Sequence, residues 1–183
     1  MSSLLKSGAT VARVRSALDE VAAELDRWCD EPAERLERRP APGAWSGSEV
    51  LEHVTLANRY LLLTLEKHTV RAVRRARSAV VTAGESDLER LARIGERASF
   101  PWHRPGHMAP TGAVAPAEAR VELARQFAAA RSHLDALANG AGTLARVRMR
   151  VDDLGPLDLY QWIYFLAQHA RRHVAQLEEL GRA

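Results

Sequence analysis

The stretch from residue 159 to residue 180, LYQWIYFLAQHARRHVAQLEEL, decides the fold class. On a helix that turns about 100° per residue, charged side chains such as Arg171 and Glu178 lie on the side opposite Leu166. The apolar residues that lie within roughly 60° of Leu166 are Leu159, Trp162, Ile163, Ala170, Leu177 and Leu180. Asp158 precedes the run and can cap its first turn, with a glutamine three residues further on. The stretch is therefore predicted to be an amphipathic helix that buries one face.

Three other helices are predicted upstream. Apolar residues in steps of three and four predict one helix over residues 11–28. Ser46 and Glu49 form a capping box that starts the next helix, which runs on into a basic stretch. A third helix follows Pro116 and ends near Asn139, which is followed by a glycine.

The composition supports the same class. The chain has 183 residues, of which 46% are apolar, and it is rich in Ala, Leu, Arg and Glu, so helix is favoured almost everywhere. We expect an all-α protein with a single domain over residues 1–183, folded as a four-helix bundle of the up-down-down-up type. The long connection between helices two and three, residues 78–116, allows two helices to lie parallel.

The segments between the helices are expected to be irregular. Residues 32–43 hold three prolines and a glycine, which predicts a loop. The long connection contains a candidate short helix over residues 86–98, with Ser86 and Glu89 as its own capping pair. Residues 145–151 alternate apolar residues with arginine, as an extended piece does. Because one strand makes no sheet, we expect a linker there.

Three histidines fall on the inward faces of two predicted helices. His169 and His173 lie four residues apart in the apolar sector of the last helix, a spacing at which two imidazoles can bind one ion. His53 lies on the inward stripe of the second helix. We expect the three to hold one divalent metal ion, Zn²⁺ or Ni²⁺, with a coordination position left for water or substrate. For each ring alone, a hydrogen-bonded core histidine is the alternative.

Polar residues near these histidines are candidates for supporting roles. Each ligating histidine needs an acceptor for its other ring nitrogen, and Glu49 and Gln176 lie nearest to His53 and His173. The alternatives are a purely capping role for Glu49 and a solvated or interhelical amide for Gln176. The catalytic residues are unknown from the sequence. Glu49 and Tyr60 are the nearest candidates for a catalytic base.

The same motifs carry a resemblance to a known family. Residues 42–53, PGAWSGSEVLEH, resemble the entry to the second helix of the DinB-like superfamily of small metal-binding bundles, in which a Trp-Ser turn and an acid precede a histidine. Residues 154–157, LGPL, followed by His169, His173 and Gln176, resemble its last helix. The resemblance implies a bundle with a parallel pair of helices, a divalent metal on three histidines, and a homodimer.

The resemblance also implies a choice of activities. Some relatives are S-transferases or isomerases that use a low-molecular-weight thiol, others are metal-dependent hydrolases, and many have no known activity. We expect transfer or isomerisation chemistry on a small-molecule substrate, with a thiol activated at the metal site. A metal-dependent hydrolase and a non-catalytic, stress-related metal-binding protein are the alternatives. The divergent region over residues 78–151 inherits nothing from the resemblance.

Other histidines carry weaker signals. His103 and His107 share the four-residue spacing, but they lie in a segment rich in proline and glycine, where helical spacing has no meaning. Long irregular loops often cover pockets, so these two are candidates for a lid. His68 and His133 are expected at the surface or at its boundary with the core.

The charge pattern does not favour nucleic acid as a partner. The 26 Lys+Arg and 23 Asp+Glu give a net charge of only +3, and acids are spread among the bases. Arginines in residues 71–77 and 146–150 form two basic runs, and neither has the interleaved aromatics of a base-stacking surface. We expect solvated faces there, or contact with an anionic substrate at the mouth of the site.

Cysteine usage and hydropathy suggest a compartment. Cys29 is the only cysteine, which excludes an internal disulfide and predicts a buried, inert thiol in a reducing environment. No apolar run approaches the roughly 18 residues of a membrane span, and the N-terminus lacks the pattern of a signal peptide. We expect a soluble, cytoplasmic protein without a membrane partner.

Overall fold

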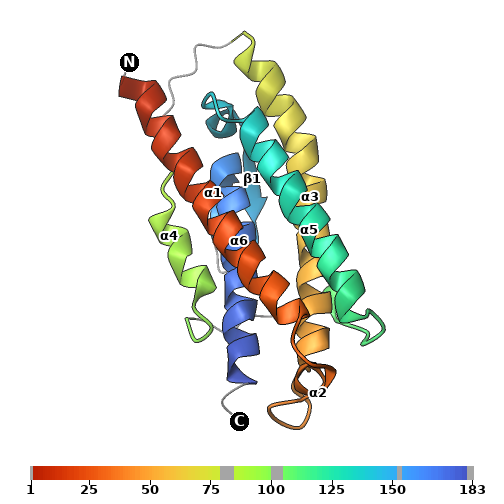
Figure 1. Ribbon diagram of the computed structural model, residues 1–183. Helices are drawn as coiled ribbons and strands as arrows, with labels where there is room; N and C mark the ends of the chain where they lie inside the picture. Colours follow the sequence, from red (N-terminus) through yellow and green to blue (C-terminus); the bar gives the residue numbers. More distant parts are fainter. Residues whose placement is uncertain (1, 79–84, 100–104, 152–153, 181–183) are drawn as a thin grey trace.

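The computed structural model describes residues 2–78, 85–99, 105–151 and 154–180, and most of these are helical (Figure 1). The four long helices are α1 (Ser2–Cys29), α3 (Gly47–Ala76), α5 (Pro116–Ala136) and α6 (Leu159–Glu179). The shorter elements are the helices α2 (Ala33–Leu36) and α4 (Glu89–Ala92), the 3-10 turns η1 (Arg93–Gly95), η2 (Gly106–Met108) and η3 (Ala141–Leu144), and the strands β1 (Arg146–Met149) and β2 (Gly155–Asp158). The predicted mostly helical class is confirmed.

The long helices pack side by side around a shared apolar core. α3 packs against α5 and α6, and α1 packs against the same two helices. In Figure 1, α1 and α6 run downward while α3 and α5 run upward, so α3 and α5 lie parallel. The long connection between this pair contains α4, η1 and η2. No helix in the described ranges is both long and apolar enough to cross a membrane.

The two helices that carry the candidate ligands both start at a capping box. Ser46 Oγ accepts a hydrogen bond from Glu49 N (3.3 Å), and Glu49 Oε2 accepts one from Ser46 N (2.9 Å). Asp158 and Gln161 exchange the same pair of bonds at the start of α6. Both predicted caps are confirmed. Because these bonds are local, they fix where each helix begins and therefore which residues face the core.

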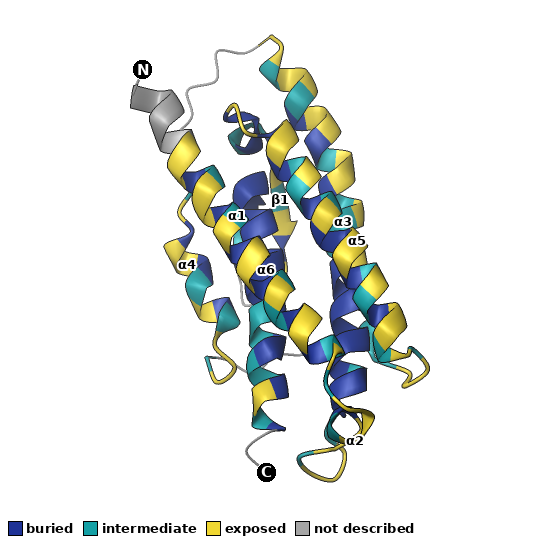
Figure 2. Cartoon of the chain, in the orientation of Figure 1, coloured by how far each residue is buried: buried dark blue, intermediate teal, exposed yellow. Residues whose placement is uncertain are grey.

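α6 is buried around more of its circumference than a helix that has one face exposed to solvent. Every residue from 157 to 170 is buried, and only the last third has an exposed side (Figure 2). The reason is that α4 and η1 pack against α6, in addition to the contacts from α1 and α3. The long connection thus covers the side of α6 that the other long helices leave open.

The expectation of an unpaired extended linker at residues 145–151 was wrong. β1 pairs with β2 in an antiparallel two-stranded sheet, with Arg146 opposite Asp158 and Met149 opposite Gly155. Glycine and proline at the start of β2 have low strand propensity, which hides the strand in the sequence. Proline is tolerated because each strand of a two-stranded sheet is an edge.

The connecting segments differ from the prediction in detail. The helix expected over residues 86–98 is reduced to α4 and η1, and Ser86 does not cap it. Instead, Ser86 Oγ donates to Asp158 Oδ2 (2.7 Å), and Gln161 Nε2 donates to the Asp87 carbonyl (2.8 Å). These bonds tie the connection to the first turn of α6. The predicted loop at residues 32–43 contains one helical turn, α2, and α5 ends earlier than expected, at Ala136.

Candidate metal centre

The structure brings the three predicted ligands together. His53, from the second turn of α3, meets His169 and His173, which lie one turn apart on α6. One ring nitrogen from each lies within 4.8 Å of the other two, and all three side chains are buried. The Nε2 atoms of His169 and His173 are 3.3 Å apart, and the His53 ring centroid lies 4.6 Å from that of His173. The sequence prediction that these helices face each other through their histidines is confirmed.

Hydrogen bonds orient two of the three imidazoles. His53 Nδ1 donates to the backbone carbonyl of Met108 (2.6 Å), and His173 Nδ1 donates to Gln176 Oε1 (3.0 Å). A proton on Nδ1 leaves the lone pair on Nε2, which is the tautomer that can bind a metal from that atom. Gln176 therefore accepts a hydrogen bond from His173, as the sequence predicts. Met108 was not anticipated, because a backbone carbonyl brought in by the chain fold has no sequence signal.

Glu49, the other predicted acceptor, is engaged in a different way. Its carboxylate accepts two bonds from the Arg39 guanidinium (2.5 and 2.8 Å) as well as the capping bond from Ser46 N. The Arg39 contact is the main reason that the pKa of Glu49 is lowered from its ordinary value. This geometry favours the capping alternative for Glu49.

Aromatic side chains form part of the wall around the imidazoles. The Trp45 ring centroid lies 4.7 Å from that of His53 and 6.4 Å from that of His173. Phe165 lies one turn before His169 on α6, and its ring is nearly parallel to that imidazole at 6.4 Å. Trp45 belongs to the motif that starts α3, so the same turn that sets the helix register also places an apolar ring against the cluster.

Burial keeps the imidazoles of α6 neutral. It lowers the pKa of His169 well below its ordinary value, and the neighbouring His173 and His53 add to this effect. Burial also lowers the pKa of His173 to about 3, reinforced by His53 and opposed by the bond to Gln176. Neutral imidazole is the form that ligates a metal ion, so these two rings need not lose a proton to bind one at neutral pH.

The donor set fits a divalent metal of the zinc or nickel type. With metal–nitrogen distances of about 2.1 Å, two nitrogens in tetrahedral coordination lie about 3.4 Å apart, and the two Nε2 atoms of α6 are separated by 3.3 Å. Two buried lone pairs that face each other at this distance need a proton or a cation between them. Imidazole nitrogens suit both Zn²⁺ and Ni²⁺.

Comparison with known proteins decides the family. A model of the DinB superfamily matches residues 10–177. The chain belongs to the DinB superfamily. No curated protein and no solved structure matches the chain. The DinB match includes both motifs that carry the three histidines.

One lid candidate, His107, contacts the base candidate Tyr60. η2 contains His107, whose ring centroid lies 4.4 Å from that of Tyr60 on α3. Tyr60 follows His53 by two helical turns and is partly exposed. His107 therefore packs over α3 near the metal centre, whereas His103 lies outside the described residues.

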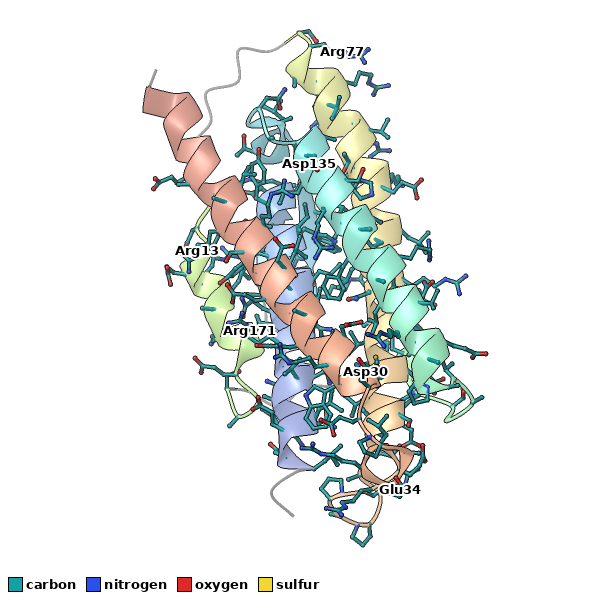
Figure 3. All side chains as sticks on the ribbon, in the orientation of Figure 1. Arg13, Asp30, Glu34, Arg77, Asp135 and Arg171 are labelled. Carbon is teal, nitrogen blue, oxygen red and sulfur yellow. The ribbon has the colours of Figure 1, made fainter. Side chains whose placement is uncertain are left out.

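The first arginine run lies far along α3 from the three histidines. Arg71 follows His53 by 18 positions on α3, which places it about 27 Å along the helix axis. Figure 3 labels Arg77 at the far end of the same helix. Arg75 Nη1 donates to the Leu144 carbonyl (2.8 Å), just before β1, so the two runs adjoin each other. All four arginines of residues 71–77 are exposed, as the solvated-face alternative predicts.

The remaining predicted residues behave as inert groups. Cys29 is half-buried beside a groove of about 320 Å³ between α1 and α5, and burial raises the pKa of its thiol to about 11. It therefore stays protonated, and a protonated thiol is a poor nucleophile. His68 and His133 are both half-buried, as expected for the boundary of the core.

Proposed function

We propose that this DinB-superfamily chain is a divalent-metal-dependent enzyme that activates a low-molecular-weight thiol for transfer or isomerisation of a small-molecule substrate. The proposal takes residues 1–183 as one four-helix-bundle domain of the up-down-down-up type, with Zn²⁺ or Ni²⁺ on His53, His169 and His173. One observation carries it: three buried imidazoles converge, and two of them are held with the lone pair on Nε2.

When bound, the metal supplies Lewis acidity that lowers the pKa of a thiol or water molecule at its remaining coordination position. The three histidines act as ligands only, because each uses its inward nitrogen for coordination. Met108 and Gln176 hold two of these rings in place through Nδ1. Trp45 keeps water away from one side of His53, which strengthens electrostatic interactions at the site.

Tyr60 is the residue we propose to test first for proton transfer. It lies on the same face of α3 as His53, partly exposed and beside His107. Glu49 is a weaker base for this purpose because Arg39 lowers its pKa and already occupies both carboxylate oxygens. Replacing Tyr60 with Phe removes only the hydroxyl, so metal content should be retained while the rate falls.

Metal loading provides the decisive experiment. Protein loaded with Zn²⁺ or Ni²⁺ and then desalted should hold one ion per chain by elemental analysis, and His53→Ala should lose it. His133→Ala is the matched control, because His133 is a half-buried histidine on α5 outside the cluster. The loaded protein is then screened with bacterial-type low-molecular-weight thiols and electrophilic substrates. If wild type binds neither metal, or His53→Ala keeps the ion, the proposed site is wrong.

The same screen separates the alternative functions. Turnover of ester or amide substrates without added thiol would indicate a hydrolase instead. Metal that raises the melting temperature while no substrate is turned over would indicate a non-catalytic metal-binding protein.

A further inference from the structure

A buried carboxylate, that of Glu52, lies next to the candidate metal ligand His53 on α3. Glu52 is only 2% exposed, and it faces residues 105–113, which we call the strap. Its Oε1 accepts hydrogen bonds from Thr111 N (2.9 Å) and Thr111 Oγ1 (2.7 Å), and its Oε2 accepts one from Gly112 N (2.8 Å). These three bonds satisfy a charge that would otherwise be costly to bury.

The local conformation of the strap is built for this carboxylate. Gly112 has a φ of +74°, in the left-handed region, and the turn directs two successive backbone N–H groups toward the same carboxylate. Thr111 Oγ1 donates to Glu52 and also accepts from Ala113 N (3.2 Å), which stiffens the turn. Such a pair of N–H groups is an anion-binding concavity, and here Glu52 supplies the anion.

The strap contacts the candidate metal centre at His53, the residue that follows Glu52 on α3. It supplies the Met108 carbonyl that accepts from His53 Nδ1, and its His107 ring packs against Tyr60. Met108 precedes Thr111 by three positions, so the chain between them spans at most about 10 Å. Releasing Thr111 from Glu52 therefore frees the Met108 carbonyl to leave His53.

We propose that Glu52 is a positioning residue for the metal centre, which docks the strap so that Met108 holds His53 in its ligating tautomer and orientation. This inference rests on the proposed metal site. Among the described residues, the carboxylate of Glu52 bonds to Thr111 and Gly112 and is not part of the three-histidine cluster, so it acts through Met108 and not on the ion. Strap docking and metal binding are then coupled, and the coupling is reciprocal: metal stabilises the docked strap as much as the docked strap stabilises the metal.

The test compares two glutamates one turn apart on α3. Glu52→Gln keeps the shape but turns an N–H donor toward N–H donors of the strap, and its Zn²⁺ affinity, measured by chelator competition, should fall about tenfold or more. Glu49→Gln weakens the capping box and the contact with Arg39 but leaves the strap bonds intact, so its Zn²⁺ affinity should stay close to that of wild type. Urea denaturation of the metal-free proteins reports separately on the fold.

Amide hydrogen exchange at Thr111 and Gly112 distinguishes coupling to the metal from a purely structural role of Glu52. Adding Zn²⁺ to wild type should slow exchange at both amides, and the slowing should be lost in Glu52→Gln. Thr111→Val removes the hydroxyl but keeps the backbone bonds, so it should weaken Zn²⁺ binding by less than Glu52→Gln does. This variant tests the proposal if Glu52→Gln fails to fold.

The outcomes separate this inference from the proposed function. If wild type binds Zn²⁺ and both Glu52→Gln and Thr111→Val bind it equally well, the positioning role is overturned and the metal site stands. Equal weakening in Glu49→Gln and Glu52→Gln, or exchange at the strap that ignores Zn²⁺, also overturns the coupling. A wild-type protein that binds no metal defeats the site itself.

Discussion

The α3–α6 interface and the α1–α5 interface both join long helices, but they are built from different interactions. At α3–α6, the three imidazoles are buried together, and Trp162 Nε1 donates to the Leu61 carbonyl (3.0 Å). At α1–α5, Arg131 pairs with Asp19 (2.6 Å) at the surface. Arg120 also pairs with Asp26 of α1 and with Asp30, which follows the end of α1, beside the groove that Cys29 lines.

The difference shows where this fold can hold a precise geometry. Exposed ion pairs contribute little to stability, because water and salt screen them and both side chains lose freedom. Buried polar groups must be satisfied by defined partners, so their positions are tightly constrained. The three-histidine cluster lies in the interface where displacement of a polar group is costly, whereas the ion pairs of the α1–α5 interface tolerate displacement.

Truncating the buried stripe of α6 should have the largest effect. Leu166 is fully buried one turn before Ala170, and Leu166→Ala should lower the free energy of unfolding by about 2–5 kcal/mol, through lost burial and the cavity left behind. Urea denaturation measures this. Val121→Ala on α5 is the control, since that side chain is largely exposed and its loss should be nearly neutral. Equal effects would remove the contrast between the two interfaces.

Acid should weaken the α3–α6 interface before the α1–α5 interface. The pKa of His173 is lowered from 6.5 to about 3, so the unfolded chain takes up the proton first as the pH falls. The stabilisation is complete above about pH 6.5 and is lost toward pH 3, with an upper limit on the order of 5 kcal/mol. Arg120 lowers the pKa of Asp26 below 3.8, so that pair does not titrate between pH 6.5 and 4.

Denaturation of the metal-free protein at several pH values measures this loss. His173→Asn removes the titrating ring and should flatten the dependence between pH 6.5 and 4. An unchanged slope in that variant would show that other groups carry the acid sensitivity.

Breaking an ion pair of α1–α5 should have the smallest effect. Arg131→Ala removes the contact with Asp19 and should change the free energy of unfolding by less than about 1 kcal/mol, less at high salt than at low salt. A loss as large as that of Leu166→Ala would show that this interface is also held by specific geometry. The affinity for Zn²⁺ should be unchanged, because the pair lies on helix surfaces away from the histidines.

Local signals explain what could be predicted from the sequence. The starts of α3 and α6 depend on hydrogen bonds between residues three positions apart, Ser46 with Glu49 and Asp158 with Gln161, and such bonds are readable from residue types. Once the starts are known, helical periodicity places His53 on the inward face, and the histidines of α6 follow in the same way. The three-histidine cluster was therefore predictable from the sequence.

Contacts between distant segments explain what was missed. The Met108 carbonyl and the Glu52 contact with Thr111 depend on where the connection crosses α3, and no periodicity encodes that path. β2 was missed because Gly155 and Pro156 disguise a strand that forms only when β1 lies beside it. The burial of α6 on all sides has the same origin, since α4 comes from the connection.

The capping box of α6 also sets how far along the helix, and at what angle around its axis, each histidine lies. Asp158 is tied to the connection through Ser86, and His169 lies roughly 16 Å further along the helix from that fixed point. An extra residue between the two would turn both imidazoles by about 100° around the helix axis, away from His53. An insertion or deletion between Asp158 and His169 would therefore disrupt the three-histidine cluster, whereas a change of length in the loop just before Asp158 would leave the phase of α6 unchanged.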